Sequence, residues 1–401
     1  MTASLLAGVE MAPRDPILGI TEAFHADTNP NKINLGVGVY TDDAGKVPLL
    51  ECVRRADRTI LENPTPWSYL PIDGLAAYDK AVQALIFGAE STVLAQGRGV
   101  TVQAIGGTGA LKICADFLRR VSPGAQVLIS NPSWENHRAL FEGAGFSVQE
   151  YPYYDAATHG LNFAGMAAAL DAAPAGTIVV LHVCCHNPTG VDLAAEHWAE
   201  VLRIVKARNL VPILDSAYQG FAESIDADGA VVRQFAEACS PVFVASSFSK
   251  SFSLYGERVG ALSVATASSE ESARVLSQLK RVVRANYSNP PTHGGKAVAA
   301  ILTTPELRAL WDRELGAMRD RIRAMRRELV ERLHARIPGA DFSFMLRQRG
   351  MFSYSGLSKA QVVRLREEFS VYVIETGRIC VAALNSHNID RAAEAIAAVA
   401  R

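Results

Sequence analysis

The sequence predicts an α/β fold: a large domain with a mainly parallel sheet covered by helices on both faces, plus a smaller α+β domain. Between about residues 47 and 300, short apolar segments alternate with longer amphipathic segments. Such strand–helix–strand alternation is typical of a parallel sheet covered by helices. After residue 300 the alternation is replaced by one long helical pattern and then by short segments of both kinds. The length of 401 residues also favours about two domains.

Five short apolar segments are the predicted strands of the large domain. They cover residues 101–106, 126–130, 177–185, 210–214 and 241–245. The third, TIVVLHVCC, is almost continuously apolar, as expected of a strand buried on both faces. The stretches GALKICADFLRRV and LAAEHWAEVLRIVKARN lie between strands and have the apolar spacing of covering helices.

A long helix is predicted at about 305–336 and is expected to connect the two domains. Thr304 suits the N-cap, Pro305 suits the first helical position, and Pro338-Gly339 ends the pattern. We therefore expect an N-terminal arm at 1–13, a large domain at 47–317, and a small domain formed by 14–46 together with 318–401.

The small domain is expected to contain paired strands and a capped helix. DFSFML and GMFSYSG alternate as paired strands do, and VYVIE is a further predicted strand. SKAQVVRLREEF begins with a capping-box pattern from Ser358 to Gln361. In such a fold, ligands bind at the carboxyl ends of the parallel strands, facing the second domain.

Composition argues against several classes of function. Forty basic and 41 acidic side chains give a net charge of -1, so binding to nucleic acid or to a membrane surface is not expected. Six cysteines without a C-x-x-C motif indicate neither a disulfide framework nor a zinc ribbon. The N-terminal residues lack the pattern of a secretory signal, and no apolar run reaches the roughly 18 residues of a membrane span. A cytoplasmic location is expected.

The stretch SSFSKSFSLYGERVG follows the predicted strand 241–245 and contains one lysine, Lys250, and one arginine, Arg258. Serines and aromatic residues surround the lysine. One interpretation is an exposed surface loop. The other is a lysine that acts as a neutral amine, because burial and a nearby cation both lower the pKa of an ammonium group.

Other unusual residues also follow predicted strands. GGTGALK, which begins at Gly106, lacks the spacing of dinucleotide and triphosphate motifs, so it indicates either a single-phosphate site or a tight turn. Asp215 ends a strand and is either a helix N-cap or the partner of a ring nitrogen. Asn187 begins the stretch Asn-Pro-Thr-Gly, which is typical of a turn. A metal site in CCHNPTG is not expected, because Cys184 and Cys185 would point to opposite faces of a strand.

Three larger side chains have two interpretations each. Trp134 is either a core residue or a ring that stacks on a ligand. Arg378, inside an apolar strand, needs either an internal acid or the carboxylate of a ligand. Arg284, near a helix end, is either an exposed charge or a carboxylate ligand. A reactive lysine, a phosphate cradle, an acid, a stacking ring and an arginine together match pyridoxal phosphate bound to an amino acid.

Six motifs carry a resemblance to a known family. They are SSFSKSFSLYGERVG, HNPTG, DSAYQGF, NPSWENH, YSNPP and the arginine of ETGRICVA. The chain resembles the fold-type I aminotransferases, in the branch of aspartate aminotransferase and bacterial aromatic-amino-acid aminotransferase. The resemblance runs from about Asp15 to the C-terminus. It implies pyridoxal 5'-phosphate as the cofactor and a homodimer with shared active sites.

The resemblance also implies a role for each matching residue. Lys250 bonds to the cofactor and acts as the base, Asp215 is the partner of the ring nitrogen with His137 behind it, and Tyr218 contacts the ring oxygen. The implied cofactor-binding residues are Gly107, Thr108, Trp134, Asn187, Asp215, Tyr218, Ser247, Ser249, Lys250 and Arg258, with Tyr69 from the neighbouring subunit. The implied substrate-binding residues are Gly38, Trp134, Asn187 and Arg378, with Arg284 from the other subunit.

The implied reaction is transamination of tyrosine and phenylalanine, and also of aspartate, with 2-oxoglutarate as acceptor in a ping-pong mechanism. WENHRALFEGAGF, FSLYGERVG and RQRGMFSYSGLS favour the aromatic branch. Val47 is apolar where aspartate-specific members tend to be polar, while Thr41 and Ser68 match neither branch. The alternatives are a dedicated aspartate aminotransferase and a lyase or decarboxylase, although the pair Arg284 and Arg378 argues against the latter. No metal is expected.

Overall fold

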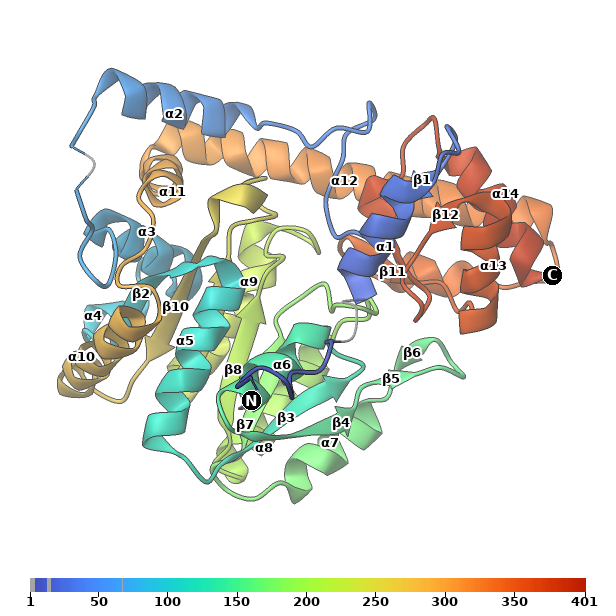
Figure 1. The fold of residues 1–401 in the computed structure, drawn as a ribbon. Helices are drawn as coiled ribbons and strands as arrows, with labels where there is room; N and C mark the ends of the chain where they lie inside the picture. The colour runs from blue at the N-terminus through green and yellow to red at the C-terminus, as the bar shows by residue number, and fades with distance from the viewer. Residues whose placement is uncertain (1–3, 13–15, 67) are drawn as a thin grey trace.

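The computed structural model of the chain describes residues 4–12, 16–66 and 68–401. Its centre is a seven-stranded sheet of order β2-β10-β9-β8-β7-β3-β4 (Figure 1). The strands are β2 (Gly99–Ile105), β3 (Gln126–Asn131), β4 (Ser147–Pro152), β7 (Ile178–His182), β8 (Val211–Ser216), β9 (Val242–Ser247) and β10 (Val259–Ala265). Neighbouring strands are parallel except for β10, which is antiparallel to both β2 and β9. The predicted mainly parallel sheet is confirmed.

Helices cover both faces of this sheet, and the alternation along each strand assigns side chains to the faces. On β8, Ile213 belongs to one hydrophobic cluster and Leu214 to the other. The cluster that contains Ile213 includes residues of α5 (Gly106–Val121), α6 (Glu135–Gly143) and α10 (Ser269–Asn286). The cluster that contains Leu214 includes residues of α2 (Glu51–Glu62), α3 (Ala76–Phe87), α7 (Phe163–Ala172), α8 (Ala195–Ala207), α9 (Ile225–Ala238) and α11 (His293–Thr303).

The long helix α12 (Pro305–Arg336) matches the predicted 305–336 helix and has Pro305 at its start. In Figure 1 it runs from the sheet, where α2 lies along it, to a separate group of elements near the C-terminus. Buried leucines along its length, among them Leu315 and Leu333, join it to the hydrophobic core at both ends. None of the helices in the described part of the chain combines the length and apolar character of a membrane span.

The elements at the far end of α12 combine short strands and helices. They are α1 (Pro16–Ala26), β1 (Ile33–Asn34), β11 (Phe352–Tyr354), α13 (Lys359–Phe369), β12 (Val371–Tyr372), β13 (Arg378–Cys380) and α14 (Ile389–Ala400). β1 pairs with β12 in parallel, and β11 pairs with β13 in antiparallel orientation. A strand near the N-terminus, β1, therefore forms a small sheet with β12 from the C-terminal part of the chain. The capping box of α13 is confirmed, since the Ser358 hydroxyl accepts the Gln361 N–H.

Two sequence-based strand predictions need correction. DFSFML is no strand: Ser343–Arg347 forms a 3₁₀ turn, because the Asp341 carboxylate accepts the Ser343 N–H at 2.7 Å and starts a local turn instead of a ladder. The strand predicted at 177–185 ends at His182. Beyond it the Asp192 carboxylate accepts the N–H groups of Cys185 and His186 at 2.7 and 2.8 Å. These backbone donors are therefore satisfied by a loop and not by the sheet.

Candidate active site

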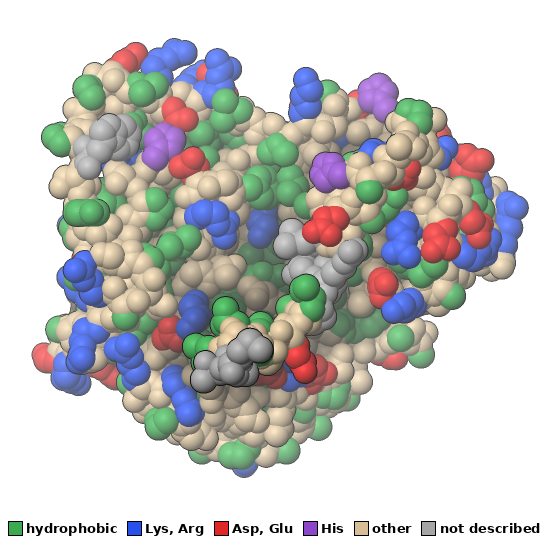
Figure 2. All heavy atoms as spheres, viewed as in Figure 1, with side chains coloured by type: hydrophobic (Ala, Val, Ile, Leu, Met, Phe, Trp, Pro, Cys, Tyr) green, Lys and Arg blue, Asp and Glu red, His purple; other side chains and the backbone are tan. Residues whose placement is uncertain are grey.

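A cavity of about 220 Å³ lies at the carboxyl ends of β7, β8 and β9. Figure 2 shows the molecule hollowed between the sheet and the C-terminal elements, with Lys and Arg side chains inside the hollow. Twelve of the residues predicted from the sequence line this cavity: Gly38, Gly107, Thr108, Trp134, Asn187, Asp215, Tyr218, Ser247, Ser249, Lys250, Arg258 and Arg378. These residues span more than 300 positions of the chain, so the fold and not local sequence brings them together.

Lys250 lies just after β9, with its Nζ 5.0 Å from the centre of the Tyr218 ring. No hydrogen bond or ion pair joins this Nζ to another described residue. Burial lowers the pKa of Lys250 to about 8; the Asp215 carboxylate opposes this shift, and the cations Arg258 and Arg378 add to it. Much more of this lysine than of an exposed one is therefore a neutral amine at neutral to mildly basic pH, and its burial excludes the surface-loop interpretation.

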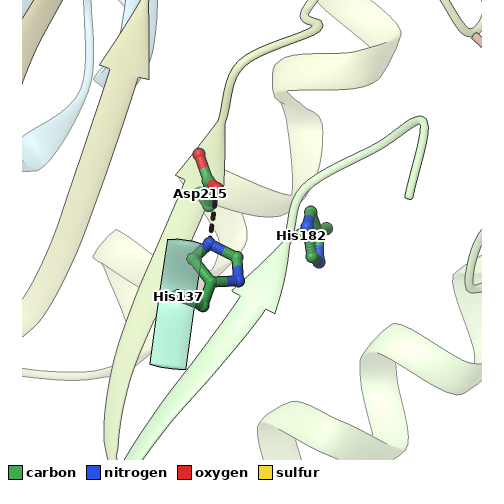
Figure 3. Close-up of side chains that lie close together, drawn as sticks. All are labelled: His137, His182 and Asp215. Atoms are coloured by element: carbon green, nitrogen blue, oxygen red, sulfur yellow. Dashed lines mark hydrogen bonds and ion pairs between the residues drawn. The ribbon is translucent and has the colours of Figure 1, made fainter. Parts of the chain in front are cut away.

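Asp215 belongs to a buried chain of hydrogen bonds. Its Oδ2 lies 2.9 Å from His137 Nε2, and His137 Nδ1 lies 2.9 Å from the Ser133 hydroxyl. Figure 3 shows one carboxylate oxygen turned toward the His137 ring and the other turned away from it. Burial alone would raise the pKa of Asp215, but the hydrogen bond and charge of His137, with the charge of Lys250, hold this pKa below its usual value. Asp215 is therefore a carboxylate inside the cavity and not a helix N-cap.

His182 also lines the cavity, beside this pair. Burial, helped by the charge of His137, lowers the pKa of His182 to about 3, so its ring is neutral. Neither ring nitrogen has a hydrogen-bond partner in the described part of the chain. Donor atoms of His137, His182 and Asp215 lie within 4.8 Å of one another, as in a metal site (Figure 3). However, both nitrogens of His137 already serve Ser133 and Asp215, so metal binding would require breaking those bonds.

A cradle for an anion lies at the start of α5. No side chain caps this helix N-terminus, and Gly107 and Thr108 of its first turn line the cavity. A Cβ atom at Gly106, where φ is +65°, would lie 2.6 Å from Arg258 Nη2, and one at Gly107 would lie 3.0 Å from Ser247 Cβ. Arg258 Nη1 donates to the Ser249 hydroxyl at 3.3 Å. Glycine backbone, a guanidinium and serine hydroxyls thus converge, which favours the phosphate interpretation of GGTGALK over a simple turn.

Arg378 is almost fully buried, with 1% of its surface exposed, and it has no acidic partner among the described residues. Its Nη1 donates to Asn187 Oδ1 at 3.1 Å and its Nη2 to the Gly36 carbonyl at 2.7 Å, while its guanidinium lies 4.3 Å from the centre of the Phe352 ring. Its Nε has no hydrogen-bond partner. The internal salt bridge considered from the sequence is therefore not formed. A buried arginine without an anion is suited to the carboxylate of a ligand.

Tyr69 and Arg284 lie outside the cavity. Tyr69 is 89% exposed. Arg284 is also exposed, at the end of α10, and its Nη1 donates to the Ser288 hydroxyl at 2.5 Å. Their predicted action on a second subunit stays a prediction.

Five residues of the cavity were not predicted as site residues: Leu111, His182, Ala217, Tyr255 and Phe352. Tyr255 lies within the serine-rich stretch, five residues after Lys250, and its hydroxyl accepts the Tyr40 N–H at 3.0 Å. An aromatic residue so close to the lysine was a usable signal. Phe352 had none, because it occurs in an ordinary strand pattern and reaches the site only through packing.

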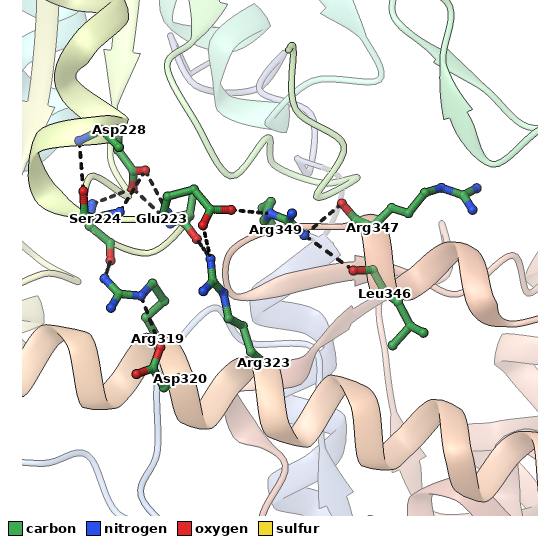
Figure 4. A network of polar contacts seen from close by, with 12 residues as sticks. Glu223, Ser224, Asp228, Arg319, Asp320, Arg323, Leu346, Arg347 and Arg349 are labelled. Atoms are coloured by element: carbon green, nitrogen blue, oxygen red, sulfur yellow. Dashed lines mark hydrogen bonds and ion pairs between the residues drawn. The ribbon is translucent and has the colours of Figure 1, made fainter. Parts of the chain in front are cut away.

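The loop after Tyr218 is held by two carboxylates (Figure 4). The buried Asp228 accepts the backbone N–H groups of residues 220, 222, 223 and 224. Glu223 pairs with Arg323 of α12 at 2.7 Å and with Arg349 at 3.0 Å. Arg349 N–H in turn donates to the Gly190 carbonyl at 2.6 Å, beside the HNPTG turn. The loop after Tyr218 is thereby connected to α12, and through Arg349 to the HNPTG turn and the C-terminal elements.

Comparison with known proteins identifies relatives along the whole chain. The family model of aminotransferase class I and II matches residues 30–396. An aspartate aminotransferase of Pseudomonas aeruginosa is 62% identical, over 99% of this chain and 100% of its own length. An aromatic-amino-acid aminotransferase of Escherichia coli is 51% identical, over 96% of this chain and 97% of its own. The structure of an aromatic-amino-acid aminotransferase from Burkholderia pseudomallei, covalently bound to pyridoxal phosphate, has a TM-score of 0.97 and 67% identity, with 100% of both chains covered.

Proposed function

The chain belongs to the class I and II aminotransferases and is a pyridoxal-phosphate-dependent aminotransferase of the aspartate and aromatic branch, and we propose that it prefers aromatic amino acids while also accepting aspartate. The amino acceptor in this proposal is 2-oxoglutarate. The buried Arg378, a cation without an acid, and the lowered pKa of Lys250 carry the transamination chemistry. The aromatic preference rests on the apolar Val47 and on the aromatic name of the structural neighbour at 67% identity.

The residues of the cavity fit pyridoxal phosphate. Gly107, Thr108, Ser247, Ser249 and Arg258 line the end of the cavity that suits a phosphate. Asp215 offers an ionised oxygen for a protonated ring nitrogen, and Lys250 offers an amine. Trp134 is half-buried at the wall, where a flat ring would stack on it. Asn187 and Tyr218 provide the polar groups for a ring oxygen.

Pyridoxal phosphate supplies an aldehyde that reacts with amines and a ring that withdraws electrons from the substrate. The protein supplies orientation and proton transfer. Arg378 would hold the carboxylate of the amino acid, with Asn187 fixing the guanidinium, so that Cα lies within reach of Lys250 Nζ. Lys250, with its lowered pKa, would then accept the Cα proton. Asp215, kept ionised through His137, would hold a proton on the ring nitrogen.

The proposed substrate range is supported by both kinds of relative. Proteins named aspartate aminotransferase and aromatic-amino-acid aminotransferase are 62% and 51% identical to this chain. The structural neighbour at 67% identity carries the aromatic name. The exposed Arg284 would contact the second carboxylate of aspartate, and the apolar Val47 favours the aromatic side chain. A dedicated aspartate aminotransferase is the second candidate, supported by the Pseudomonas relative.

A homodimer with shared active sites is part of the proposal. Tyr69 and four apolar side chains of the N-terminal arm, Leu5, Leu6, Val9 and Met11, are 70% to 97% exposed in the single chain, which is unusual for such residues. A second copy of the chain would cover them. We also propose the predicted domain division, with 14–46 and 318–401 as one domain, and a cytoplasmic location, which the six free cysteines support. Residues 14 and 15 of the predicted small domain lie outside the described residues, as do residues 1–3 and 13 of the predicted arm and residue 67 of the predicted large domain.

The substrate range is tested by absorption spectra of the cofactor-loaded protein mixed with single amino acids. Tyrosine, phenylalanine and aspartate should each convert the cofactor to its amino form, with the aromatic amino acids reacting at lower concentration. Negligible conversion by both aromatic amino acids would leave the dedicated aspartate aminotransferase as the function. Failure to form any 2-oxo acid would indicate a lyase or decarboxylase.

A further inference from the structure

Gln103 is a buried glutamine whose hydrogen bonds join two segments that are distant in the sequence. It lies on the edge strand β2 and is 1% exposed. Its backbone N–H donates to the Asp73 carbonyl at 2.8 Å, and its Oε1 accepts the Leu75 N–H at 3.3 Å. Its Nε2 donates to the Pro291 carbonyl at 2.8 Å, and its own carbonyl accepts the Tyr287 hydroxyl at 3.2 Å. One residue therefore contacts segment 73–75 and segment 287–291.

Two glycines leave space for this side chain. A Cβ atom at Gly74, where φ is +109°, would lie 2.4 Å from Gln103 Cβ. A Cβ atom at Gly295 would lie 2.6 Å from Gln103 Nε2. Any larger residue at either position would displace the amide. The glutamine is thus enclosed between the two segments in one position, and its contacts are not an incidental surface arrangement.

Each segment continues from a residue that the proposed function assigns to the partner's active site. Segment 73–75 follows Tyr69 by a few residues, and segment 287–291 follows Arg284 at the end of α10. A second contact, the ion pair between Lys280 and Asp73 at 2.9 Å, also joins α10 to the first segment. Its side chains are 39% and 23% exposed, so solvent weakens it, whereas Gln103 is 1% exposed and its amide bonds lie largely out of solvent.

We propose that Gln103 is a positioning residue: its side-chain amide holds the Tyr69 segment and the Arg284 segment in one fixed arrangement, so that both reach the neighbouring active site together. This inference rests on the proposed function, which places both side chains at the partner's site. Gln103 itself does not line the cavity. It acts on recognition of the second carboxylate through Arg284.

The first test is a double-mutant cycle on the half-reaction with single amino acids. Gln103→Met, which keeps the length of the side chain and removes both amide bonds, should raise the apparent Kd for aspartate about tenfold, the result of a modest loss of binding free energy. The apparent Kd for phenylalanine should change less than about twofold, because its ring needs no second cation. In an Arg284→Leu background, Gln103→Met should raise the apparent Kd for aspartate by less than a further factor of about two. The reason is that Gln103 acts through Arg284, which is already absent.

The second test separates the two contacts without measuring activity. Gln103→Glu keeps the acceptor for the Leu75 N–H but removes the donor to the Pro291 carbonyl. Hydrogen exchange of the dimer should therefore become faster in the peptide that covers 286–292 and stay unchanged in the peptide that covers 69–76. Gly295→Ala, which pushes a methyl group against the amide, should accelerate exchange in both peptides. Lys280→Met is the matched control, because it removes only the exposed ion pair; both peptides should keep their rates.

Several results would overturn the inference. If Gln103→Glu raises the apparent Kd for aspartate and phenylalanine equally, or if its effect persists in the Arg284→Leu background, Gln103 is a structural residue only. If Gln103→Met does not fold, Gln103→Glu and Gly295→Ala carry the same comparison. A normal response of Arg284→Leu itself to aspartate overturns the role of Arg284 in the proposed function, and with it the role of Gln103. If Arg284→Leu raises the apparent Kd for aspartate but the Gln103 variants do not, only the inference about Gln103 is overturned.

Discussion

The two ends of the cavity are built in different ways. At the sheet end, Asp215 and Ser247 lie at the carboxyl ends of β8 and β9, and Lys250 follows β9, so the hydrogen-bond ladder of these strands sets their positions. At the outer end, Arg378 and Gly38 belong to segments that lie beyond the sheet, and the residues predicted to meet the substrate side chain lie exposed outside the cavity. The groups for the shared chemistry are therefore held in one rigid unit. The groups proposed to contact the substrate come from separate pieces of the chain, and one of them, Arg284, is proposed to act at the site of a second copy.

The largest effect is expected at the sheet end, from Lys250→Ala. Removal of the only amine in the cavity among the described residues should slow proton transfer at Cα about 10²- to 10⁴-fold for every amino acid and abolish the pH-dependent absorption of the bound cofactor. Stopped-flow absorption measures the first effect and a pH titration the second. Lys206→Ala, at an exposed lysine of α8, is the control and should behave as wild type. If Lys250→Ala slowed the reaction of aspartate only, the proposed difference between the two ends of the cavity would be contradicted.

A smaller effect is expected from Arg378→Lys at the outer end. Lysine keeps the charge but loses the planar fork, so kcat/KM should fall about tenfold for aromatic amino acids and for aspartate alike. Arg284→Lys should lower kcat/KM by a similar factor for aspartate only. The pair of variants separates the carboxylate that all substrates share from the one that only dicarboxylates carry. If Arg378→Lys and Arg284→Lys lowered kcat/KM for phenylalanine equally, the outer end would not distinguish dicarboxylates from aromatic amino acids through Arg284.

The pH dependence of the sheet end follows from the lowered pKa of Lys250, about 8. Below this pH the amine is protonated and unreactive, so covalent capture of pyridoxal phosphate by the cofactor-free protein should accelerate about tenfold per pH unit and level off above pH 8. The Asp215 carboxylate raises the pKa of Lys250, so in Asp215→Asn the profile should move to lower pH. Stopped-flow absorption across this range measures both. A profile unmoved by Asp215→Asn would mean that the two groups are not coupled.

The smallest effect is expected from Glu223→Gln, which removes the ion pairs that connect the loop after Tyr218 to Arg323 and Arg349 (Figure 4). These side chains are 38% to 54% exposed, so the free energy of unfolding should fall by at most about 1 kcal/mol, and less at high salt. Half-reaction rates should not change. Urea unfolding at two salt concentrations provides the measurement. A changed rate would show that the loop geometry depends on this pair and not on Asp228.

Much of the sheet end could be predicted from the sequence. Lys250, Asp215 and Asn187 each follow an apolar strand, and parallel strands bring such positions to one edge. The long helix and the capping box of α13 were also correct, because both depend on local spacing and local hydrogen bonds. The strand predicted at DFSFML was wrong, since a carboxylate turn replaced the expected ladder. Strands β4 and β10 were not predicted, and β10 is the strand that breaks the parallel pattern.

The sequence by itself determined which chemical groups are present and along which strands they follow, because apolar periodicity and turn residues act over short distances. Only the tertiary structure excluded one of the two interpretations for Lys250, Asp215 and Arg378. It shows Arg378 buried without an acid, Asp215 bonded to His137, and Lys250 with a lowered pKa. It also placed Tyr255, Phe352 and Gln103. Burial and unpaired hydrogen-bonding groups result from contacts between residues hundreds of positions apart, and no local pattern encodes them.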